Sequence, residues 1–293
     1  MDQAQNLRNI IKLQNQTESR KARVITVTSG KGGVGKSSLS INLAVQFRKL
    51  GKSVIIFDAD FGLANIEVMF GAIPKYNLAD VIYRGRGIKD IIVKGPMDIG
   101  FVSGGSGING LGDLNYEQIN YLTHKLNELE SMADIIIVDT GAGISESVLG
   151  FVASSSEILL VTTPEPTSIT DAYALLKALN LKEGFEREST KIRIVANKTS
   201  SREEGKNLYN KLNAVVRKFL NIDLSFLGSV PMDDNLRKAI MQQKPISMIY
   251  PNSESSKHFA GLAEGLINGD EDVSPKKRGL VSAMLRMFKS SHS

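Results

Sequence analysis

A glycine-rich run between a predicted strand and a predicted helix constrains this chain more than any other feature. The run Gly30–Ser37 fits the pattern G-x-x-x-x-G-K-[S/T] of a phosphate-binding loop. A short β-branched stretch precedes it, and apolar residues at helical spacing follow it. The glycines let backbone N–H groups surround a phosphate, and the helix N-terminus adds partial positive charge. The sequence therefore predicts a nucleotide site formed by Gly30, Lys31, Gly32, Gly33, Val34, Gly35, Lys36, Ser37 and Ser38.

Two acidic residues at strand ends complete the expected phosphate and metal chemistry. Lys36 should reach the β- and γ-phosphates, and the Ser37 hydroxyl should bind Mg²⁺. Asp58 follows one buried apolar strand, and Asp139 ends the Walker B strand. We expect both carboxylates to support Mg²⁺ through water.

A second lysine, Lys31, lies inside the loop. In this position it resembles the signature lysine of the deviant Walker A ATPases, the MinD/ParA family. The resemblance implies an ATP-dependent homodimer in which this lysine crosses the interface and contacts the partner's nucleotide, as an arginine finger does. The alternative is a solvated loop lysine.

The resemblance extends to both switch regions. Asp60 matches the family's switch I aspartate, which orients or deprotonates the attacking water. The resemblance implies that Lys31, Lys36 and Asp60 are the catalytic residues. The alternative for Asp60 is that it caps the following helix. The run D-T-G-A-G matches the MinD-like switch II and places Asp139, Thr140, Gly141 and Gly143 in it. Gly141 and Gly143 should give this segment the freedom of a loop, with a backbone N–H free to sense the γ-phosphate.

The base is expected to be adenine. Asn197 ends a predicted strand and is placed to read adenine N6 and N7. The following lysine suggests a guanine motif, but Ser200 occupies the position where that motif requires Asp. Pro231, Met232 and Asp233 resemble the family's adenine-side loop, so ATP with Mg²⁺ is preferred over GTP.

Composition narrows the class further. The chain is 42% hydrophobic and 23% charged, and no apolar run approaches the length of a transmembrane helix. It has no cysteine, which argues against the iron–sulfur branches of the family. The net charge is +5, and it comes from the last residues: five basic and no acidic residues follow Pro275. A basic tail on a neutral body favours a local anionic surface rather than nucleic acid.

The N-terminal segment, residues 1–22, contains a short amphipathic pattern. Its string D-Q-A-x-x-L-R resembles the flagellar-number branch of the family (FlhG/FleN type). That branch uses the segment to contact and stimulate a flagellar GTPase of the signal-recognition-particle type (FlhF-like). The alternatives are a frayed terminus or a helix packed on its own body. The residues implied in the contact are Asp2, Gln3, Ala4, Leu7 and Arg8.

The C-terminal segment follows a polar linker, residues 269–275. Residues 276–293 combine an apolar helical face with basic flanks, the pattern of an interfacial membrane helix. The expected membrane face is Leu280, Val281, Met284, Leu285 and Phe288. The alternative is docking on the body, which we expect in at least one nucleotide state. The expected location is the cytoplasm, peripheral on the inner face of the cell membrane when ATP is bound.

Strands and helices alternate through residues 23–268, which predicts an α/β fold with a doubly wound, mostly parallel sheet. The resemblance implies the SIMIBI-type topology of P-loop NTPases and a dimerising ATPase that regulates flagellar number or placement. Flagellar switch (C-ring) components or a flagellar transcription regulator are further expected partners. The alternatives are a DNA-partition ATPase of the ParA type, a MinD-type regulator of the cell-division site, and a nonhydrolysing binding module.

Overall fold

The computed structural model describes residues 21–60, 65–71, 74–105, 116–269 and 280 of the 293-residue chain. Their centre is an eight-stranded sheet in the order β3-β4-β2-β5-β1-β6-β7-β8. Neighbouring strands are parallel except at one edge, where β3 runs antiparallel to β4. The doubly wound, mostly parallel sheet is therefore confirmed. The strands are β1 (Arg23–Ser29), β2 (Val54–Ala59), β3 (Val93–Lys94), β4 (Gly100–Ser103), β5 (Ile135–Ala142), β6 (Glu157–Thr162), β7 (Lys191–Thr199) and β8 (Leu224–Pro231).

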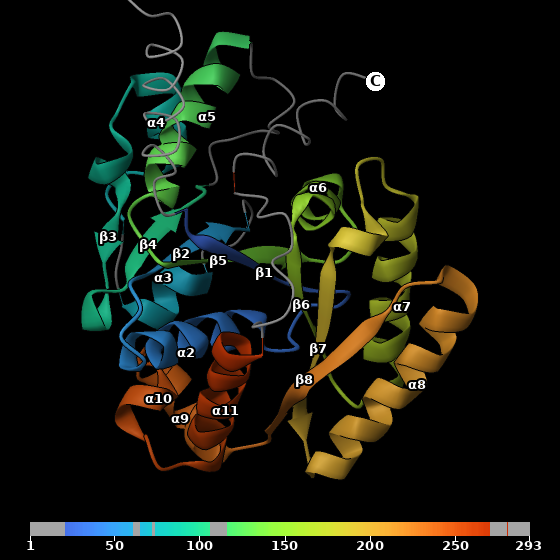
Figure 1. The fold of residues 1–293 in the computed structure, drawn as a ribbon. Helices are drawn as coiled ribbons and strands as arrows, with labels where there is room; N and C mark the ends of the chain where they lie inside the picture. The colour runs from blue at the N-terminus through green and yellow to red at the C-terminus, as the bar shows by residue number, and fades with distance from the viewer. Residues whose placement is uncertain (1–20, 61–64, 72–73, 106–115, 270–279, 281–293) are drawn as a thin grey trace, which may run out of the picture.

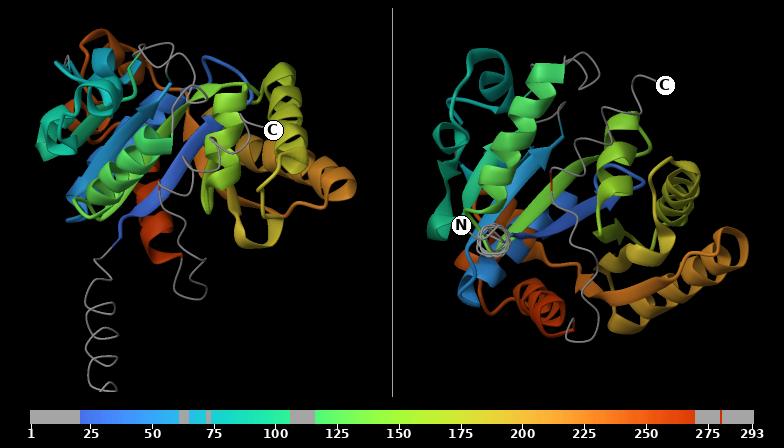
Figure 2. Two further views of the ribbon diagram at one scale, coloured as in Figure 1. Left: turned by 90° about the horizontal axis from the view of Figure 1, so that it is seen from above. Right: turned by 45° about the horizontal axis from the view of Figure 1, so that its top comes forward.

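Helices cover both faces of the sheet (Figure 1). The α-helices are α2 (Lys36–Lys49), α3 (Asn65–Phe70), α4 (Leu78–Arg84), α5 (Tyr116–Glu130), α6 (Glu146–Ser154), α7 (Pro166–Leu181), α8 (Arg202–Leu220), α9 (Asp234–Met241), α10 (Ile246–Ile249) and α11 (Glu254–Asn268). Short 3-10 turns occupy Ile88–Ile91, Pro96–Asp98 and Arg187–Ser189. The two views of Figure 2 show the same layered arrangement, with α2 and α11 on the side of the sheet opposite α5 and α6.

The strands are buried on both faces, which explains their nearly continuous apolar sequences. In β1, Ile25 and Val27 belong to the cluster under α2 and α11, whereas Val24 belongs to the cluster under α4 and α5. A third cluster lies between the sheet and α6, α7 and α8. The alternation of side chains along each strand thus fills the cores on both faces.

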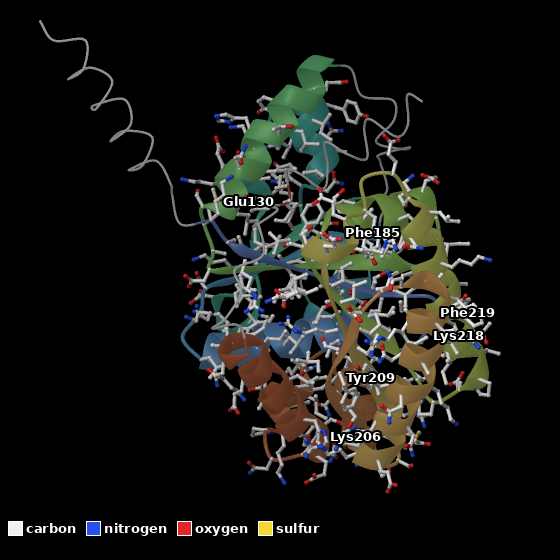
Figure 3. The ribbon with its side chains drawn as sticks, turned by 45° about the vertical axis from the view of Figure 1, so that its right-hand side comes forward. Glu130, Phe185, Lys206, Tyr209, Lys218 and Phe219 are labelled. Carbon is white, nitrogen blue, oxygen red and sulfur yellow. The ribbon has the colours of Figure 1, made fainter. Side chains whose placement is uncertain are left out.

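Helix α8 shows how the outer layer is fixed. Ser201 caps it by accepting a hydrogen bond from the Glu204 N–H, and buried side chains recur at helical spacing. On its inner side the Tyr209 hydroxyl donates to the Leu224 carbonyl at 2.8 Å. Figure 3 views the molecule toward this helix, whose exposed residues include Lys206, Lys218 and Phe219.

A closed ion network lies at the amino ends of β1, β6 and β7. The Glu157 carboxylate accepts two hydrogen bonds from Arg23, at 2.7 and 2.8 Å, and also pairs with Arg193. A further Arg23 N–H donates to the Leu266 carbonyl near the end of α11, at 2.6 Å. This network ties three strands and the last helix of the body together.

Leu280 is the one described residue of the C-terminal tail, and it is fully buried. It belongs to the cluster formed by the sheet, α4 and α5. The sequence predicts Leu280 on a membrane face, but here it has the docked arrangement expected for at least one nucleotide state. The other tail residues, Val281, Met284, Leu285 and Phe288, and the N-terminal Asp2, Gln3, Ala4, Leu7 and Arg8 lie outside the described residues.

Within the described part of the chain, every helix is too short or too polar to cross a membrane.

Candidate nucleotide-binding site

The glycine-rich loop connects β1 to α2 at the carboxyl edge of the sheet, as the sequence predicts. It borders a cavity of about 670 Å³. Loop residues Gly32, Gly33, Gly35, Lys36, Ser37 and Ser38 line this cavity together with Ala59, Asp60, Met69, Gly141, Ala142, Ser145, Ser147 and Val148. The cavity thus brings the loop together with both switch regions.

Two loop glycines are required by their surroundings. A Cβ on Gly30 would lie 2.1 Å from the Asp171 carbonyl oxygen, so glycine allows α7 to approach the loop closely. Gly35 precedes α2 with a φ of 98°, a left-handed conformation that disfavours other residues. A Cβ there would also lie 2.3 Å from the Asn197 amide nitrogen.

The two metal-site carboxylates lie side by side. Asp58 and Asp139 are directly opposite each other in the register of β2 and β5. Asp139 accepts hydrogen bonds from the hydroxyls of Ser37, at 2.6 Å, and Ser40, at 2.9 Å. The structure therefore groups Ser37, Asp58 and Asp139, the three residues expected at the Mg²⁺ site.

Burial perturbs the titration of these groups. Burial raises the pKa of Asp58 to about 8, against the lowering effect of a backbone hydrogen bond from Asp60. Burial likewise raises the pKa of Asp139 to about 6, although the hydrogen bond from Ser37 and the charge of Lys36 act in the opposite direction. The pKa of Lys36 is lowered by burial despite the nearby acids.

These groups fit a bound divalent cation. The acids share one buried ammonium, so a hard cation with oxygen ligands would relieve the excess negative charge. No set of three or more His, Cys, Asp or Glu side chains among the described residues could hold a metal alone. The Ser37 hydroxyl and the carboxylates of Asp58 and Asp139 are oxygen ligands that suit Mg²⁺, which keeps water and phosphate ligands.

Of the predicted switch residues, Asp60 and Gly141 line the same cavity. Asp60 lines the cavity, and its charge acts on Lys36, Asp58 and Asp139. The Thr140 hydroxyl lies 3.1 Å from the Val27 carbonyl, and the Gly143 N–H donates to the Ser29 carbonyl at 2.9 Å. Gly141 lies within β5, so this part of switch II is strand rather than the free loop expected from its glycines. Switch II is thus tied to β1, the strand that leads into the phosphate loop.

Lys31 does not line the cavity of its own chain. Its ammonium pairs with the Glu165 carboxylate at 2.9 Å and lies 2.9 Å from the Thr167 hydroxyl. The side chains of Lys31 and Glu165 are 37% and 58% exposed, so this pair lies at the surface. Lys31 therefore differs from Lys36, which is buried among the acids.

The base-side residues have structural contacts in this conformation. Asn197 is buried and donates from its amide to the Val34 carbonyl at 2.7 Å. Asp233 caps α9 by accepting from the Asn235 N–H, and it also accepts from the Ser255 N–H. Burial alone would raise the pKa of Asp233, but these backbone hydrogen bonds outweigh it and lower the pKa. Pro231 ends β8, and Met232 is 73% exposed. Adenine recognition by these four residues stays a prediction.

Three residues that contact the phosphate loop or its acids were not predicted from the sequence. Ser40 could have been found, because it lies three residues after Ser37 on the same helix face. Lys198 donates to the Gly33 carbonyl at 2.8 Å, and its only sequence signal was the Asn-Lys pair. Glu165 has no local signal, since 134 residues separate it from Lys31.

The sequence is similar to a known nucleotide-binding family and to two bacterial proteins. Residues 25–246 match the model of the CobQ/CobB/MinD/ParA nucleotide binding domain. The chain is 41% identical to the antiactivator FleN of Pseudomonas aeruginosa over 242 residues, 83% of this chain and 85% of that protein. It is 33% identical to the flagellum site-determining protein YlxH of Helicobacter pylori over 297 residues, 98% of each chain.

Solved structures share the fold. MinD in the MinC:MinD cell division protein complex of Aquifex aeolicus matches with a TM-score of 0.65 and 24% identity, over 88% of this chain and 100% of that one. The Pyrococcus horikoshii septum site-determining protein MinD, complexed with Mg-ADP, also matches at 0.65, with 22% identity over 85% and 96% of the chains. The solved structures show the shared fold, and the sequence matches show that this chain belongs to the MinD/ParA family of nucleotide-binding ATPases.

Proposed function

We propose that this protein is an ATP-hydrolysing dimerisation switch that regulates flagellar number or placement. The observation that carries the proposal is the contrast between two lysines of one loop. Lys36 lines the phosphate cavity, whereas Lys31 lies at the surface beside Glu165 and Thr167. A surface lysine on the rim of the nucleotide loop is suited to reach a second subunit's phosphates. The name of YlxH, a flagellum site-determining protein, supports the flagellar role.

The chemistry follows from the grouped residues. Loop N–H groups and Lys36 would bind the phosphates, while Ser37, Asp58 and Asp139 would hold Mg²⁺, directly or through water. Bound Mg²⁺ supplies charge neutralisation to the phosphate oxygens. Asp60 lines the cavity and would orient the attacking water. Lys31 of a second copy would stabilise the charge of the transition state, so hydrolysis requires the dimer.

The first test separates the two lysines by size-exclusion chromatography with light scattering, in ATP and Mg²⁺. Lys31→Ala should bind nucleotide but remain monomeric, and Asp60→Ala should accumulate as an ATP-bound dimer without hydrolysis. Lys89→Ala, another exposed lysine, is the matched control. Wild-type hydrolysis by Asp60→Ala, or normal dimerisation of Lys31→Ala, would contradict the mechanism.

The N-terminal segment would stimulate an SRP-type flagellar GTPase. The proposal is supported by the string D-Q-A-x-x-L-R at Asp2–Arg8. In the full chain, Gln3→Ala should reduce stimulation of GTP hydrolysis and leave ATP hydrolysis intact. Gln5→Ala, at a variable position of the string, should behave like wild type. Equal stimulation by both variants would remove the segment from this role.

The tail would bind anionic membrane after release from the body, with ATP controlling release through dimerisation. Burial of Leu280 supports a docked state, and the basic flanks support binding to anionic lipid. Two tails in one dimer would add avidity. Phe288→Glu should abolish cosedimentation with anionic liposomes, whereas Ser290→Glu should reduce it only slightly. Equal sedimentation of the ATP and ADP forms would contradict this control by nucleotide.

A further inference from the structure

The end of β7 contacts the phosphate loop through two consecutive residues. The Asn197 amide donates to the Val34 carbonyl at 2.7 Å, and the Lys198 ammonium donates to the Gly33 carbonyl at 2.8 Å. Neither Asn197 nor Lys198 lines the nucleotide cavity. The two side chains therefore hold the loop from outside the space in which phosphate would lie.

A held carbonyl also fixes the neighbouring N–H group. In a planar trans peptide, the C=O of one residue and the N–H of the next point in opposite directions. With the Gly33 carbonyl bonded to Lys198, the Val34 N–H points away from Lys198. The Val34 carbonyl on Asn197 fixes the Gly35 N–H in the same way. These N–H groups belong to the loop pattern that surrounds a phosphate.

The backbone of Lys198 is unusual for a lysine. Its φ is 57°, a left-handed conformation that is unfavourable for residues other than glycine. The pairing of β7 with β8 shifts register between Asn197 and Thr199, so Lys198 occupies a bulge. Bulges redirect a side chain from the sheet, and strained residues of this kind concentrate at functional sites. Here the bulge directs the ammonium to the loop.

Lys198 also acts on the carboxylate that holds Lys31. The pKa of Glu165 is lowered by the hydrogen bond and charge of Lys31, and further by the charge of Lys198. The charges of Lys31 and Lys198 therefore both act on the Glu165 carboxylate.

We propose that Lys198 is a positioning residue for the nucleotide phosphates. It holds the carbonyl of Gly33, a residue that lines the cavity, and thereby fixes the orientation of the following N–H in the phosphate loop. This inference rests on the proposed nucleotide site and adds a phosphate role for the lysine of the Asn-Lys pair, whose sequence suggested base recognition only.

The test uses Lys198→Gly and Lys198→Met in the full chain. Glycine removes the ammonium and also relieves the left-handed strain, so the melting temperature should stay equal or rise. The Kd for fluorescent ADP should nevertheless rise about tenfold, as expected for a lost charged hydrogen bond. Methionine keeps most of the side-chain length without the charge, so Lys198→Met should weaken ADP similarly. Asn221→Gly is the matched control, because Asn221 also has a positive φ, 53°, but lies at the end of α8.

The ratio of ADP to GDP affinity separates a phosphate role from a base role. Both Kd values should rise together in Lys198→Gly, leaving the wild-type ratio unchanged. An ADP Kd within twofold of wild type, or a changed ratio, would overturn the inference. Failure of the wild-type protein to bind ADP would instead contradict the nucleotide site itself.

Discussion

The amino ends and the carboxyl ends of the central strands bury different proportions of acidic and basic groups. At the amino ends of the strands, the single carboxylate of Glu157 pairs with two guanidinium groups. At the carboxyl ends, Asp58 and Asp139 lie opposite each other beside one ammonium, that of Lys36. The amino ends thus group one carboxylate with two cations, whereas the carboxyl ends group two carboxylates with one cation and have an excess of negative charge. The difference indicates that the groups at the amino ends stabilise the fold, whereas those at the carboxyl ends are arranged to bind a cation and phosphates.

Breaking the amino-end network should have the largest effect on stability. Glu157→Gln leaves Arg23 and Arg193 without their shared carboxylate, and we expect a loss of about 3 kcal/mol in the free energy of unfolding. Urea denaturation of nucleotide-free protein measures this loss. Glu254→Gln, which removes an exposed pair with Lys257, should leave the urea midpoint unchanged from wild type. Similar losses in the two variants would mean that the network is not energetically special.

Changing the carboxyl-end lysine should instead affect ligand binding. Lys36→Ala should weaken ADP by about a hundredfold, equivalent to about 2.7 kcal/mol, because the phosphates lose their buried cation. Calorimetric titration of ADP with Mg²⁺ gives the Kd. Glu157→Gln, assayed below its melting temperature, should bind ADP as wild type does. Similar losses of ADP affinity in Lys36→Ala and Glu157→Gln would contradict separate roles for the carboxyl and amino ends of the strands.

The pH dependence of stability should reflect the carboxyl-end acids. Because burial raises the pKa of Asp58 to about 8 and that of Asp139 to about 6, the folded protein binds more protons than the unfolded chain between their ordinary values and these values. Stability of the metal-free protein should therefore fall as pH rises from 6 to 8, by up to about 1 kcal/mol per pH unit.

Thermal unfolding of wild type and Asp58→Asn across this range measures the effect. Asp58→Asn should flatten the profile, and Mg²⁺ with ADP should stabilise wild type more strongly at pH 8 than at pH 6. If the stability of metal-free wild type rose with pH, the pKa values of these acids would not be raised by folding, and the prediction would be wrong.

The smallest stability effect is expected at the loop surface. Lys31→Ala removes an ion pair whose members are both substantially exposed, so the free energy of unfolding should hardly change. Chemical denaturation should show no resolved shift, even though dimer formation is lost. A large destabilisation would mean that Lys31 has an important role within its own subunit.

Local patterns were sufficient to predict the strands, the phosphate loop and its acids. Asp58 and Asp139 could be placed together because each comes directly after a run of apolar residues, and the carboxyl-end halves of parallel strands lie side by side. The antiparallel β3 has only two residues, too few for a periodic pattern. The Lys31–Glu165 pair and the bulge at Lys198 depend on how distant segments pack, which spacing does not encode. The position of Leu280 is likewise set by tertiary packing, because its apolar pattern fits a membrane and a protein surface equally.

The hydrogen bond from Arg23 to the Leu266 carbonyl has a geometric consequence for both ends of the chain. Arg23 lies just after the N-terminal segment, and Leu266 lies just before the C-terminal linker. The described residues next to the N-terminal segment and next to the C-terminal linker therefore lie close together. A partner captured by the N-terminal segment would be held at high effective concentration near any surface that the C-terminal segment binds. In the proposed flagellar role, recruitment to a membrane and activation of a GTPase would then occur at one place rather than at opposite poles of the molecule.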